Sequence, residues 1–543
     1  MQIFKIEFAF KIVKIYSDKM KNSSKILLGF MLVMMICCVS AVSATDINST
    51  DDAIITDDIA IDDVSGIVED VEVDDASDSV VDEGNLRTGH NNVTVTSTNY
   101  GNYFTSDGTI DVNDNLIFEG NFENLNFTVF KINRNVDIYA YNATFKNIGF
   151  NITTSDIKLN GGTFIGDENT TLPAVISIQG SHDKIKDVKI NVTAPENKNF
   201  YAIDLQNANY AELSNNEIYY VDTYANTANY NYVVKSKGGS YVKMVGNNIT
   251  AFLPLKDVDY TNYTTRFPSI DLDLVAGVAV ENGNNFNFTG NKLDVTGNLR
   301  AGYYPTLDAL LIVKSDNVNV IGNQIYERDI VSGQNDTNYL YAVDIYRCNN
   351  IKICSNKIEL NSNGGNLTVN GTGAAYGIQL TGPHTGVVIC NNNITTANNG
   401  PNLGIYSQNT QGATNLTIYG NRINVTGRAG DNPWALVSGM ELQDSYAEVY
   451  NNIINVNNIA GYHAGYCAYG ISYSQSTSGN HYYNIHNNDV TVYNGDYAVY
   501  LLKDNSVSGE IKNNTLKAVK GSGNNTGNNA IFAGRQVTKE NNN

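Results

Sequence analysis

The carboxylates of this chain are the first residues to test for catalysis. Hydrolysis of a glycosidic bond needs two carboxyl groups about 5 to 10 Å apart, flanking the bond that breaks. Asp344 and Glu441 occupy matching places in two similar segments and are candidates for such a pair. Asp271 and Asp273 alternate along one stretch and share a face, but they lie outside those segments. Whether either pair can act depends on the elements that carry it.

Other reactive groups are more scattered. Calcium-assisted elimination needs clustered aspartates with a basic residue beside them. Arg328, between Glu327 and Asp329, is the nearest approach to that arrangement. The 6 histidines show no metal-ligand spacing. The sequence therefore assigns no catalytic residue, no metal site and no cofactor.

A repeated phrase indicates which elements carry these residues. Residues 317–325 read Asn-Val-Asn-Val-Ile-Gly-Asn-Gln-Ile, with apolar residues alternating as in a β-strand. The phrase turns at a two-residue corner whose second member is asparagine. That asparagine recurs at Asn216, Asn247, Asn291, Asn323, Asn356, Asn392, Asn421, Asn452, Asn488 and Asn514. A period of roughly 26 to 44 residues is typical of stacked-repeat proteins.

A second strand precedes each corner by about a dozen residues, as in Tyr341–Ile345 and Tyr376–Leu380. The two patterns together predict a solenoid in which each strand pairs in parallel with its counterpart one coil on. Aliphatic side chains would then form inward columns. The corner asparagines would stack and hydrogen-bond along the axis.

This arrangement separates the candidate carboxylates. Aligning the second strands places in one outward column Asp204, Ala279, Leu311, Asp344, Gln379, Tyr406, Glu441, Ser472 and Tyr500. Asp344 and Glu441 then lie three coils apart, which is roughly 14 Å because neighbouring strands are ~4.8 Å apart. That distance is too long for a glycosidase pair. Solvated strand carboxylates are the preferred interpretation.

Two segments of different composition precede the repeats. Residues 1–44 hold a basic start, an apolar run at 26–39 and a small-residue cleavage site after Ala44, which is typical of a secretory signal peptide. An uncleaved membrane anchor is the alternative, although the run is short for a spanning helix. The next segment is rich in aspartate and predicts disorder.

The domain boundaries follow from these patterns. We assign residues 1–44 to the signal peptide (1–19 as a start-site overcall), 45–84 to a disordered acidic spacer, 85–135 to an N-terminal cap and first coil, 136–535 to the β-helix and 536–543 to a polar tail. The net charge of −20 argues against nucleic acid as a partner, because phosphates need a basic face. No second apolar segment follows, so we expect no membrane insertion after signal cleavage.

The repeats resemble the right-handed parallel β-helix of the pectate-lyase-like fold class. Their asparagine-rich form, behind a signal peptide and an acidic spacer, resembles the adhesin-like surface proteins of methanogenic archaea. The resemblance covers residues from about 130 to 535 and implies an all-β fold, which hosts lyases, hydrolases, epimerases and adhesins alike. The polygalacturonase motifs of this class are absent, and Gly382–Gly386 is only a faint echo of their histidine motif.

Cys354 and Cys390 hold the same repeat position on consecutive coils. Their Cα atoms should therefore lie within disulfide range. Export would permit oxidation, so a structural disulfide and two stacked thiols are both open interpretations.

Glycosylation acceptor triplets are dense. They include Asn92, Asn126, Asn142, Asn151, Asn191, Asn366 and Asn415. A chain this rich in asparagine and threonine also produces such triplets by chance.

Tyrosine is the dominant aromatic residue, with 35 copies. The candidate binding residues are Tyr303, Tyr304, Tyr462, Tyr466, Tyr469 and Tyr473. Outward rings could form a flat stacking platform for sugars or proteins. Ordinary strand composition is the alternative, and we favour it.

Taken together, the sequence and the resemblance favour an exported β-helix protein, secreted or held on the cell envelope. It would bind cell-surface glycans or proteins without catalysis, and the resemblance implies adhesion. The alternative is a polysaccharide lyase or glycoside hydrolase on the same scaffold.

Overall fold

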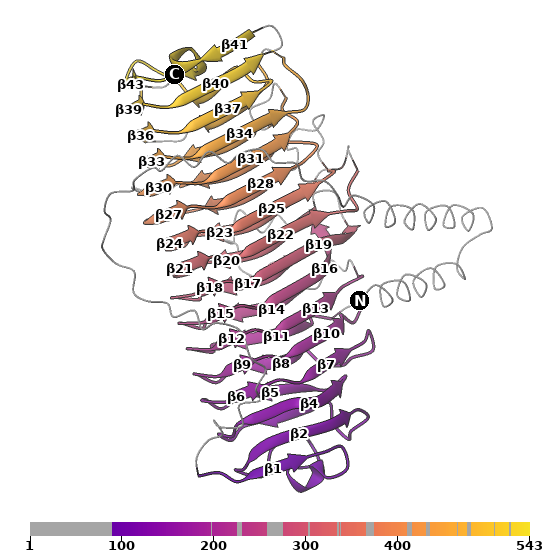
Figure 1. Cartoon of the computed structure of the whole chain (residues 1–543). Helices are drawn as coiled ribbons and strands as arrows, with labels where there is room; N and C mark the ends of the chain where they lie inside the picture. Colours follow the sequence, from indigo (N-terminus) through magenta and orange to yellow (C-terminus); the bar gives the residue numbers. More distant parts are fainter. Residues whose placement is uncertain are drawn as a thin grey trace, which may run out of the picture. The chain divides into compact units, whose positions relative to one another are not determined.

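The computed structural model (Figure 1) describes residues 89–196, 198–224, 231–257, 275–301, 305–333, 336, 338–364, 374–409, 415–430, 435–463, 465–474, 479–503, 505–520 and 523–543. The expected signal peptide and acidic spacer lie outside these residues, and so do Asp271 and Asp273.

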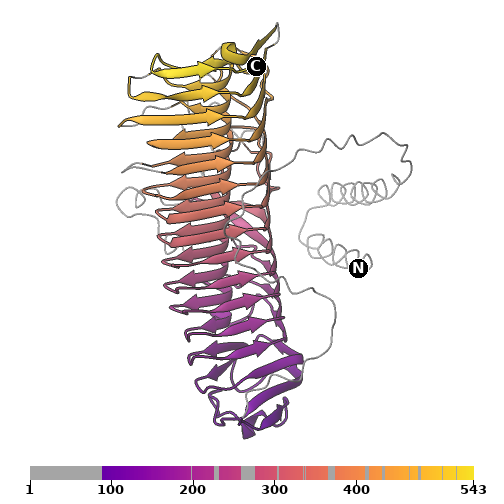
Figure 2. The same cartoon turned by 60° about the vertical axis from the view of Figure 1, so that its left-hand side comes forward.

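The described residues form a right-handed parallel β-helix, as predicted. Each strand pairs in parallel with its counterpart one coil on, and Figures 1 and 2 show the stack rising from β1 to β43. Three parallel sheets, which we name A, B and C in the order that the chain visits them, form the walls of a coil. One coil, for example, is β23 (Tyr339–Tyr346), β24 (Asn349–Cys354) and β25 (Lys357–Ser362).

The strands are assigned to these sheets by their pairing. Sheet A contains β3 (Val129–Ile132), β5 (Gly149–Ile152), β8 (Ala174–Ile178), β11 (Tyr201–Gln206), β14 (Asn231–Lys237), β17 (Val275–Glu281), β20 (Pro305–Val313), β23, β26 (Ala375–Thr381), β29 (Asn402–Gln408), β32 (Val437–Gln443), β35 (Ala468–Tyr473), β38 (Tyr497–Leu501) and β42 (Ile531–Phe532). Sheet B contains β6 (Lys158–Asn160), β9 (Lys184–Lys186), β12 (Glu212–Ser214), β15 (Lys243–Val245), β18 (Asn287–Thr289), β21 (Asp316–Ile321), β24, β27 (Val387–Cys390), β30 (Leu416–Tyr419), β33 (Tyr446–Tyr450), β36 (His481–His486), β39 (Val507–Lys512) and β43 (Val537–Glu540). Sheet C contains β7 (Thr163–Gly166), β10 (Lys189–Thr193), β13 (Glu217–Val221), β16 (Asn248–Asp257), β19 (Lys292–Ala301), β22 (Gln324–Asp329), β25, β28 (Asn393–Ala397), β31 (Arg422–Gly427), β34 (Ile453–Asn458), β37 (Asp489–Tyr493) and β40 (Thr515–Lys520).

The remaining elements lie at the two ends of the stack. β2 (Asn115–Phe122) and β4 (Ile138–Lys146) continue through the corner between sheets B and C. β1 (Asn92–Val95) and the 3-10 turn η2 (Tyr100–Asn102) lie below them. β41 (Gly523–Thr526) pairs antiparallel with β40, and the 3-10 turn η3 (Gly527–Ala530) follows it.

Alternating side chains build a dry interior. Ile325, Ile358 and Ile394 pair in register on consecutive coils and are fully buried. Burial of one such side chain contributes about 1.5–3 kcal/mol, and each needs the coil above and below it to be buried. At the N-terminal end, phenylalanines take the place of aliphatic residues and pack with ring centroids 5.1 to 6.2 Å apart, namely Phe118, Phe122, Phe130, Phe145 and Phe150.

The corner between sheets B and C explains the two-residue pattern. The first residue of each corner adopts a left-handed φ between 54° and 67°, and the set is Asn215, Gly246, Gly290, Gly322, Ser355, Asn391, Gly420, Asn451, Asn487 and Asn513. Glycine and asparagine adopt this conformation at low cost, which accounts for their choice. The second residue is the recurring asparagine, and it points into the helix.

The prediction that residues 536–543 form a tail outside the β-helix is wrong. β43 pairs in parallel with β39, and Asn542 continues the asparagine column beyond Asn514. Only Val537 in this strand is apolar and buried, so the alternation that marks the earlier strands is not visible there. At the other end, β2 lies within the segment assigned to the cap and first coil, and it pairs in parallel with β4 of the segment assigned to the β-helix.

Candidate functional site

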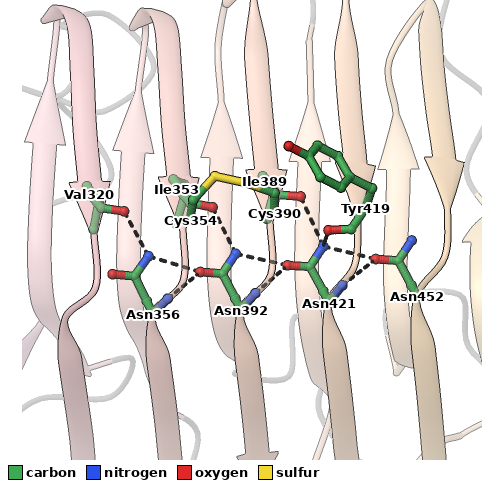
Figure 3. The surroundings of a disulfide bond; sticks show 10 residues. All are labelled: Val320, Ile353, Cys354, Asn356, Ile389, Cys390, Asn392, Tyr419, Asn421 and Asn452. Atoms are coloured by element: carbon green, nitrogen blue, oxygen red, sulfur yellow. Dashed lines mark hydrogen bonds between the residues drawn. A yellow bond between two sulfur atoms is a disulfide. The ribbon is translucent and has the colours of Figure 1, made fainter. Parts of the chain in front are cut away.

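The recurring asparagines form one hydrogen-bonded ladder inside the B–C corner, part of which Figure 3 shows. Asn392 is representative. Its Nδ2 donates to Ile353 O at 2.8 Å and to Asn421 Oδ1 at 2.9 Å. Its Oδ1 accepts from both the backbone N and the Nδ2 of Asn356, each at 2.9 Å. The same link joins every neighbour from Asn216 to Asn542. The ladder satisfies the buried amides, so its role is structural.

A disulfide joins Cys354 and Cys390 beside this ladder, with the Cα atoms 4.6 Å apart (Figure 3). It links β24 to β27, which are adjacent strands of sheet B. Cys348 and Cys467 are buried and are not disulfide-bonded. Burial raises the pKa of the Cys348 thiol to about 12, which disfavours a reactive thiolate there.

Four of the six tyrosines expected to form a platform lie among the described residues, and their settings differ. Tyr473 is wholly buried in the core, packed on His481 and Tyr483, so its assignment as a binding residue is wrong. Tyr469 is 7% exposed and stacks on Tyr500 at 4.3 Å. The two others are apart from these: Tyr462 donates to Asp496 at 3.0 Å, and Tyr466 stacks on His463. Tyr303 and Tyr304 lie outside the described residues.

The glycosylation candidates differ in exposure. Asn92, Asn126, Asn142, Asn191 and Asn415 are exposed, so an enzyme could reach them. Asn151 is only partly exposed, and its Oδ1 is buried. Asn366 falls outside the described residues.

Side chains alternate between the two faces of β22, so the residues of the expected elimination site point in opposite directions. Glu327 points into the core and is fully buried. Arg328 points outward and pairs with Asp294 at 3.1 Å. Asp329 is buried again and accepts hydrogen bonds from Asn338 and Ser362. A base and its carboxylates on opposite faces of one strand cannot act on one sugar, so this candidate is wrong.

His384 is buried inside the corner between sheets A and B. Its Nδ1 lies 2.9 Å from Gly382 O and its Nε2 lies 2.9 Å from Asp444 Oδ1, with Ser407 Oγ at 3.1 Å. A carbonyl oxygen only accepts, so Nδ1 carries a proton, and a second proton must lie between Nε2 and Asp444. His384 and Asp444 are 1% and 0% exposed and are therefore out of reach of any polymer. The partner of this histidine is 60 residues away and was not found from the sequence.

The outer face of sheet A brings together the polar and aromatic residues that can meet a ligand. Asp344, Gln379 and Tyr406 follow each other in register on β23, β26 and β29. Beside them, the rings of Tyr341 and Tyr376 stack at 5.1 Å, while Tyr406 tilts 59° from Tyr376 at 5.6 Å. The three tyrosines and Asp344 are partly exposed. We name these five residues the sheet A patch.

Burial governs the charge of the carboxyls at this patch. Burial raises the pKa of Asp344 to about 7, against hydrogen bonds from Gln379 and the Ile345 amide that lower it. Asp308, on the neighbouring coil, has a pKa well above its usual range because it is buried and faces Asp344. Behind them, burial and then Asp308 raise the pKa of Glu327 strongly. Near pH 7 the carboxyl group of Asp344 is therefore protonated in a fraction of the molecules, and in that form it can donate a hydrogen bond.

Glu441 lies in the same outward column but has another role. It is three coils from Asp344, as expected. The interpretation as a solvated carboxylate is wrong for Glu441, which is fully buried, whereas Asp344 is partly exposed. It accepts hydrogen bonds from Ser472 Oγ at 2.5 Å and from the N and Oγ of Ser474 at 2.9 and 3.0 Å. Glu441 therefore holds neighbouring strands together.

Neither a metal centre nor a membrane-spanning helix is present among the described residues. No group of three or more histidine, cysteine or acidic side chains there is placed to hold a metal ion. No helix within the same ranges is long and apolar enough to cross a bilayer.

No protein-family model matches the sequence. No curated protein matches it either. Among solved structures, the chain is similar to the periplasmic alginate epimerase AlgG, at 11% identity over 78% of this chain and 84% of that one, with a TM-score of 0.31. It is also similar to PfbA, a surface adhesin of Streptococcus pneumoniae (12%, 83% and 93%, 0.31), and to the catalytic domain of a GH87 α-1,3-glucanase (10%, 77% and 63%, 0.26). Likeness this weak carries no argument about function.

Proposed function

We propose that this chain is an exported cell-surface β-helix protein that binds glycans through the sheet A patch without catalysis. The observation that carries the proposal is the patch itself: Tyr341, Tyr376 and Tyr406 lie beside Asp344 and Gln379 on three consecutive coils. Aromatic rings pack against the apolar faces of sugars, and amide and carboxyl groups bond their hydroxyls. A protein surface is the alternative ligand for the same chemistry.

The burial of the carboxyls favours binding over turnover. A glycosidase needs two carboxyl groups that both reach the scissile bond. Asp344 is partly exposed, but Asp308 is 1% and Glu441 0% exposed. A ligand on the outer face would therefore meet one carboxyl of the three.

The test is a glycan array with the chain that starts at Thr45, followed by calorimetry on each glycan that binds. Tyr406→Ala and Tyr376→Ala should each weaken binding about tenfold or more, since each removes a partly exposed ring of the patch, whereas Gln379 is buried. Tyr482→Ala is the matched control, because Tyr482 is a stacked, exposed tyrosine on sheet B. Equal binding by all three variants would rule out the patch.

Localisation needs its own test. Cell fractionation with N-terminal sequencing should find a mature chain that starts at Thr45 and stays with the envelope. A full-length chain in the cytosol would contradict export.

A polysaccharide lyase or glycoside hydrolase is the second candidate, and one observation favours it. Asp308 and Asp344 face each other with raised pKa values, as an acid that donates a proton near neutral pH must. Incubation with pectin-like and host glycans should then release sugar, and Asp344→Asn should abolish the release. Binding on the array with no release would support the first candidate.

A further inference from the structure

A column of residues at the corner between sheets A and B carries an inference about a second site. Backbone hydrogen bonds set its register, because the amide N–H of most members donates to the residue just before the next member, as from Tyr210 to Ser240 O and from Tyr241 to Asn284 O. All its members have a left-handed φ between 54° and 64°, and from the N-terminal side they are Asp156, His182, Tyr210, Tyr241, Asn285, Asn317, Asn350 and Gly386. This corner contains described residues throughout these coils.

The aromatic members of this column are unusual for their backbone. Asparagine, aspartate and glycine tolerate a left-handed φ, whereas a bulky side chain is strained there. His182, Tyr210 and Tyr241 nevertheless occupy three consecutive coils at φ of 62°, 55° and 61°. Strain of this kind persists where the side chain has a task. None of the three rings is in the core, so the task is at the surface.

The rings form an exposed stack. His182 and Tyr210 lie 4.7 Å apart with ring planes at 9°, and Tyr210 and Tyr241 lie 4.7 Å apart at 1°. Tyr210 and Tyr241 are 49% and 46% exposed. Asp156 approaches His182 at the lower end, with 3.9 Å between Oδ1 and Nδ1. Within the stack Tyr210 lies between two rings, so the outer faces of His182 and Tyr241 are the two that no ring of the stack covers.

The column changes character immediately above Tyr241. Asn285, Asn317 and Asn350 form a short external ladder, in which Asn317 Nδ2 donates to Asn285 Oδ1 at 3.2 Å and Asn350 Nδ2 donates to Asn317 Oδ1 at 3.0 Å. Asparagine is shorter than tyrosine, so the exposed ring of Tyr241 reaches further from the backbone than the amides that follow it in the column. We call this step from the Tyr241 ring to the amides of Asn285 and Asn317 the notch; each amide has further donors and acceptors to offer.

We propose that this notch binds one pyranose residue of a glycan. The sugar would lay its C–H face on the ring of Tyr241 and hydrogen-bond its hydroxyls to Asn285 and Asn317. The notch fits a ring with one apolar face and a polar edge, which is the chemistry of a pyranose. It lies on another part of the coil from the sheet A patch and so goes beyond the function proposed above. Two sites on one rigid rod would raise the avidity for a repeating or branched glycan.

The test uses methyl pyranosides as probes and saturation-transfer NMR on the chain that starts at Thr45. Tyr406→Ala serves as the background, because it weakens binding at the sheet A patch equally in every chain compared. Tyr241→Asn removes the ring of the notch and installs the residue that the next coils carry at this position, so the fold should be kept. We expect the dissociation constant for the bound pyranoside to rise about tenfold or more in this variant.

His182→Asn is the matched control. It makes the same exchange at the far end of the stack and leaves the upper face of Tyr241 in place, so binding should be unchanged. Asn317→Ala should weaken binding by a smaller factor. Equal binding by Tyr241→Asn and the background chain would overturn the proposal, and so would capture of tyrosine-bearing peptides with no pyranoside bound. Because all these chains carry the same Tyr406→Ala change at the sheet A patch, either failure leaves the first proposal standing.

Discussion

The corner between sheets B and C and the outer face of sheet A use polar residues in opposite ways. In the corner, one residue type repeats from Asn216 to Asn542, and each buried amide bonds its neighbours on both sides. On the face, residue types change from coil to coil: Asp344, Gln379, Tyr406 and Glu441 succeed one another at one register position. Buried carboxyls there have raised pKa values, with an oxygen of Asp308 and one of Asp344 unpaired.

The difference separates stability from function within one coil. A fully bonded ladder stabilises the stack, whereas a buried carboxyl with an unpaired oxygen costs stability. Natural proteins keep such costs mainly where an activity requires them. Substitutions should therefore have opposite signs in the two regions.

The largest effect is expected at the centre of the ladder. Asn392→Ala removes the acceptor of two Asn356 donors and the donor to Ile353 O, all in a dry interior. Each buried group left unsatisfied costs about 1–3 kcal/mol, so the free energy of unfolding should fall by roughly 3–5 kcal/mol. Guanidinium unfolding followed by circular dichroism measures it. Asn393→Ala, at the exposed next residue, is the control and should stay within about 0.5 kcal/mol. Similar losses in both variants would contradict the role of the ladder.

The disulfide next to this corner should contribute the second-largest effect. Replacing both Cys354 and Cys390 with alanine opens a link across a sequence separation of 36 residues. The expected loss is about 2–4 kcal/mol, most of it through the unfolded chain. Thiol titration in denaturant checks the bond itself. The oxidised chain that starts at Thr45 should expose the two thiols of Cys348 and Cys467, rising to four after reduction. Four thiols before reduction would show that the pair is not bonded in solution.

On the outer face of sheet A, a substitution should raise the free energy of unfolding instead of lowering it. Burial raises the pKa of Asp344 from 3.8 to about 7. The stability linked to this group is therefore complete below the unfolded pKa and is lost as the pH rises through about 7. Asp344→Asn removes that loss. At ~1.4 kcal/mol per pKa unit, the variant should be more stable than the parent by about 1–3 kcal/mol at pH 8 and similar to it below pH 4.

Denaturant unfolding at pH 4, 6 and 8 measures this dependence. Asp489→Asn is the control, since Asp489 is exposed at the start of β37 on sheet C. Its stability difference from the parent should not change across the three pH values. A destabilised Asp344→Asn variant at pH 8 would make Asp344 a structural residue like Asn392.

The two regions also differ in what the sequence could predict. The corner is local: an alternating strand, a residue that tolerates a left-handed φ and an asparagine recur within a few positions, so periodicity predicts the ladder. Whether a residue on the outer face of sheet A is exposed depends on the other parts of the chain that cover it. Alignment predicts the outward column of Asp344 and Glu441 correctly, but it carries no information about burial, so it cannot predict that Glu441 is fully buried.

Tyr473 shows a miss that the sequence could have avoided. Ser472 aligns with Glu441 in the outward column, so the next residue on the strand must point inward. The residue type of Tyr473 suggests a surface position, whereas its place next to Ser472 on the strand predicts an inward one. Asp444 shows a miss of another kind, because its contact with His384 spans 60 residues and depends on two irregular corners that no repeat specifies.

The smallest effect is expected for stacked tyrosines on the outer faces of sheets A and B. Tyr450 lies in a stack with Tyr419 and His486 on the outer face of sheet B, at 5.1 Å on each side. Tyr376 stacks on Tyr341 at the same distance on sheet A. Tyr450→Leu and Tyr376→Leu should each lower the free energy of unfolding by less than about 1 kcal/mol, because leucine keeps part of the apolar contact.

Calorimetry with the array glycan then separates the two rings. Binding should be lost in Tyr376→Leu and kept in Tyr450→Leu. Tyr450 has a parallel ring on each side and so offers a ligand only its edge. Tyr406 is tilted, so one face of Tyr376 has no parallel ring stacked on it. If the two variants bind alike, stacking on sheet A is no more than the strand packing seen on sheet B, and the contrast between the regions would rest on the carboxyls alone.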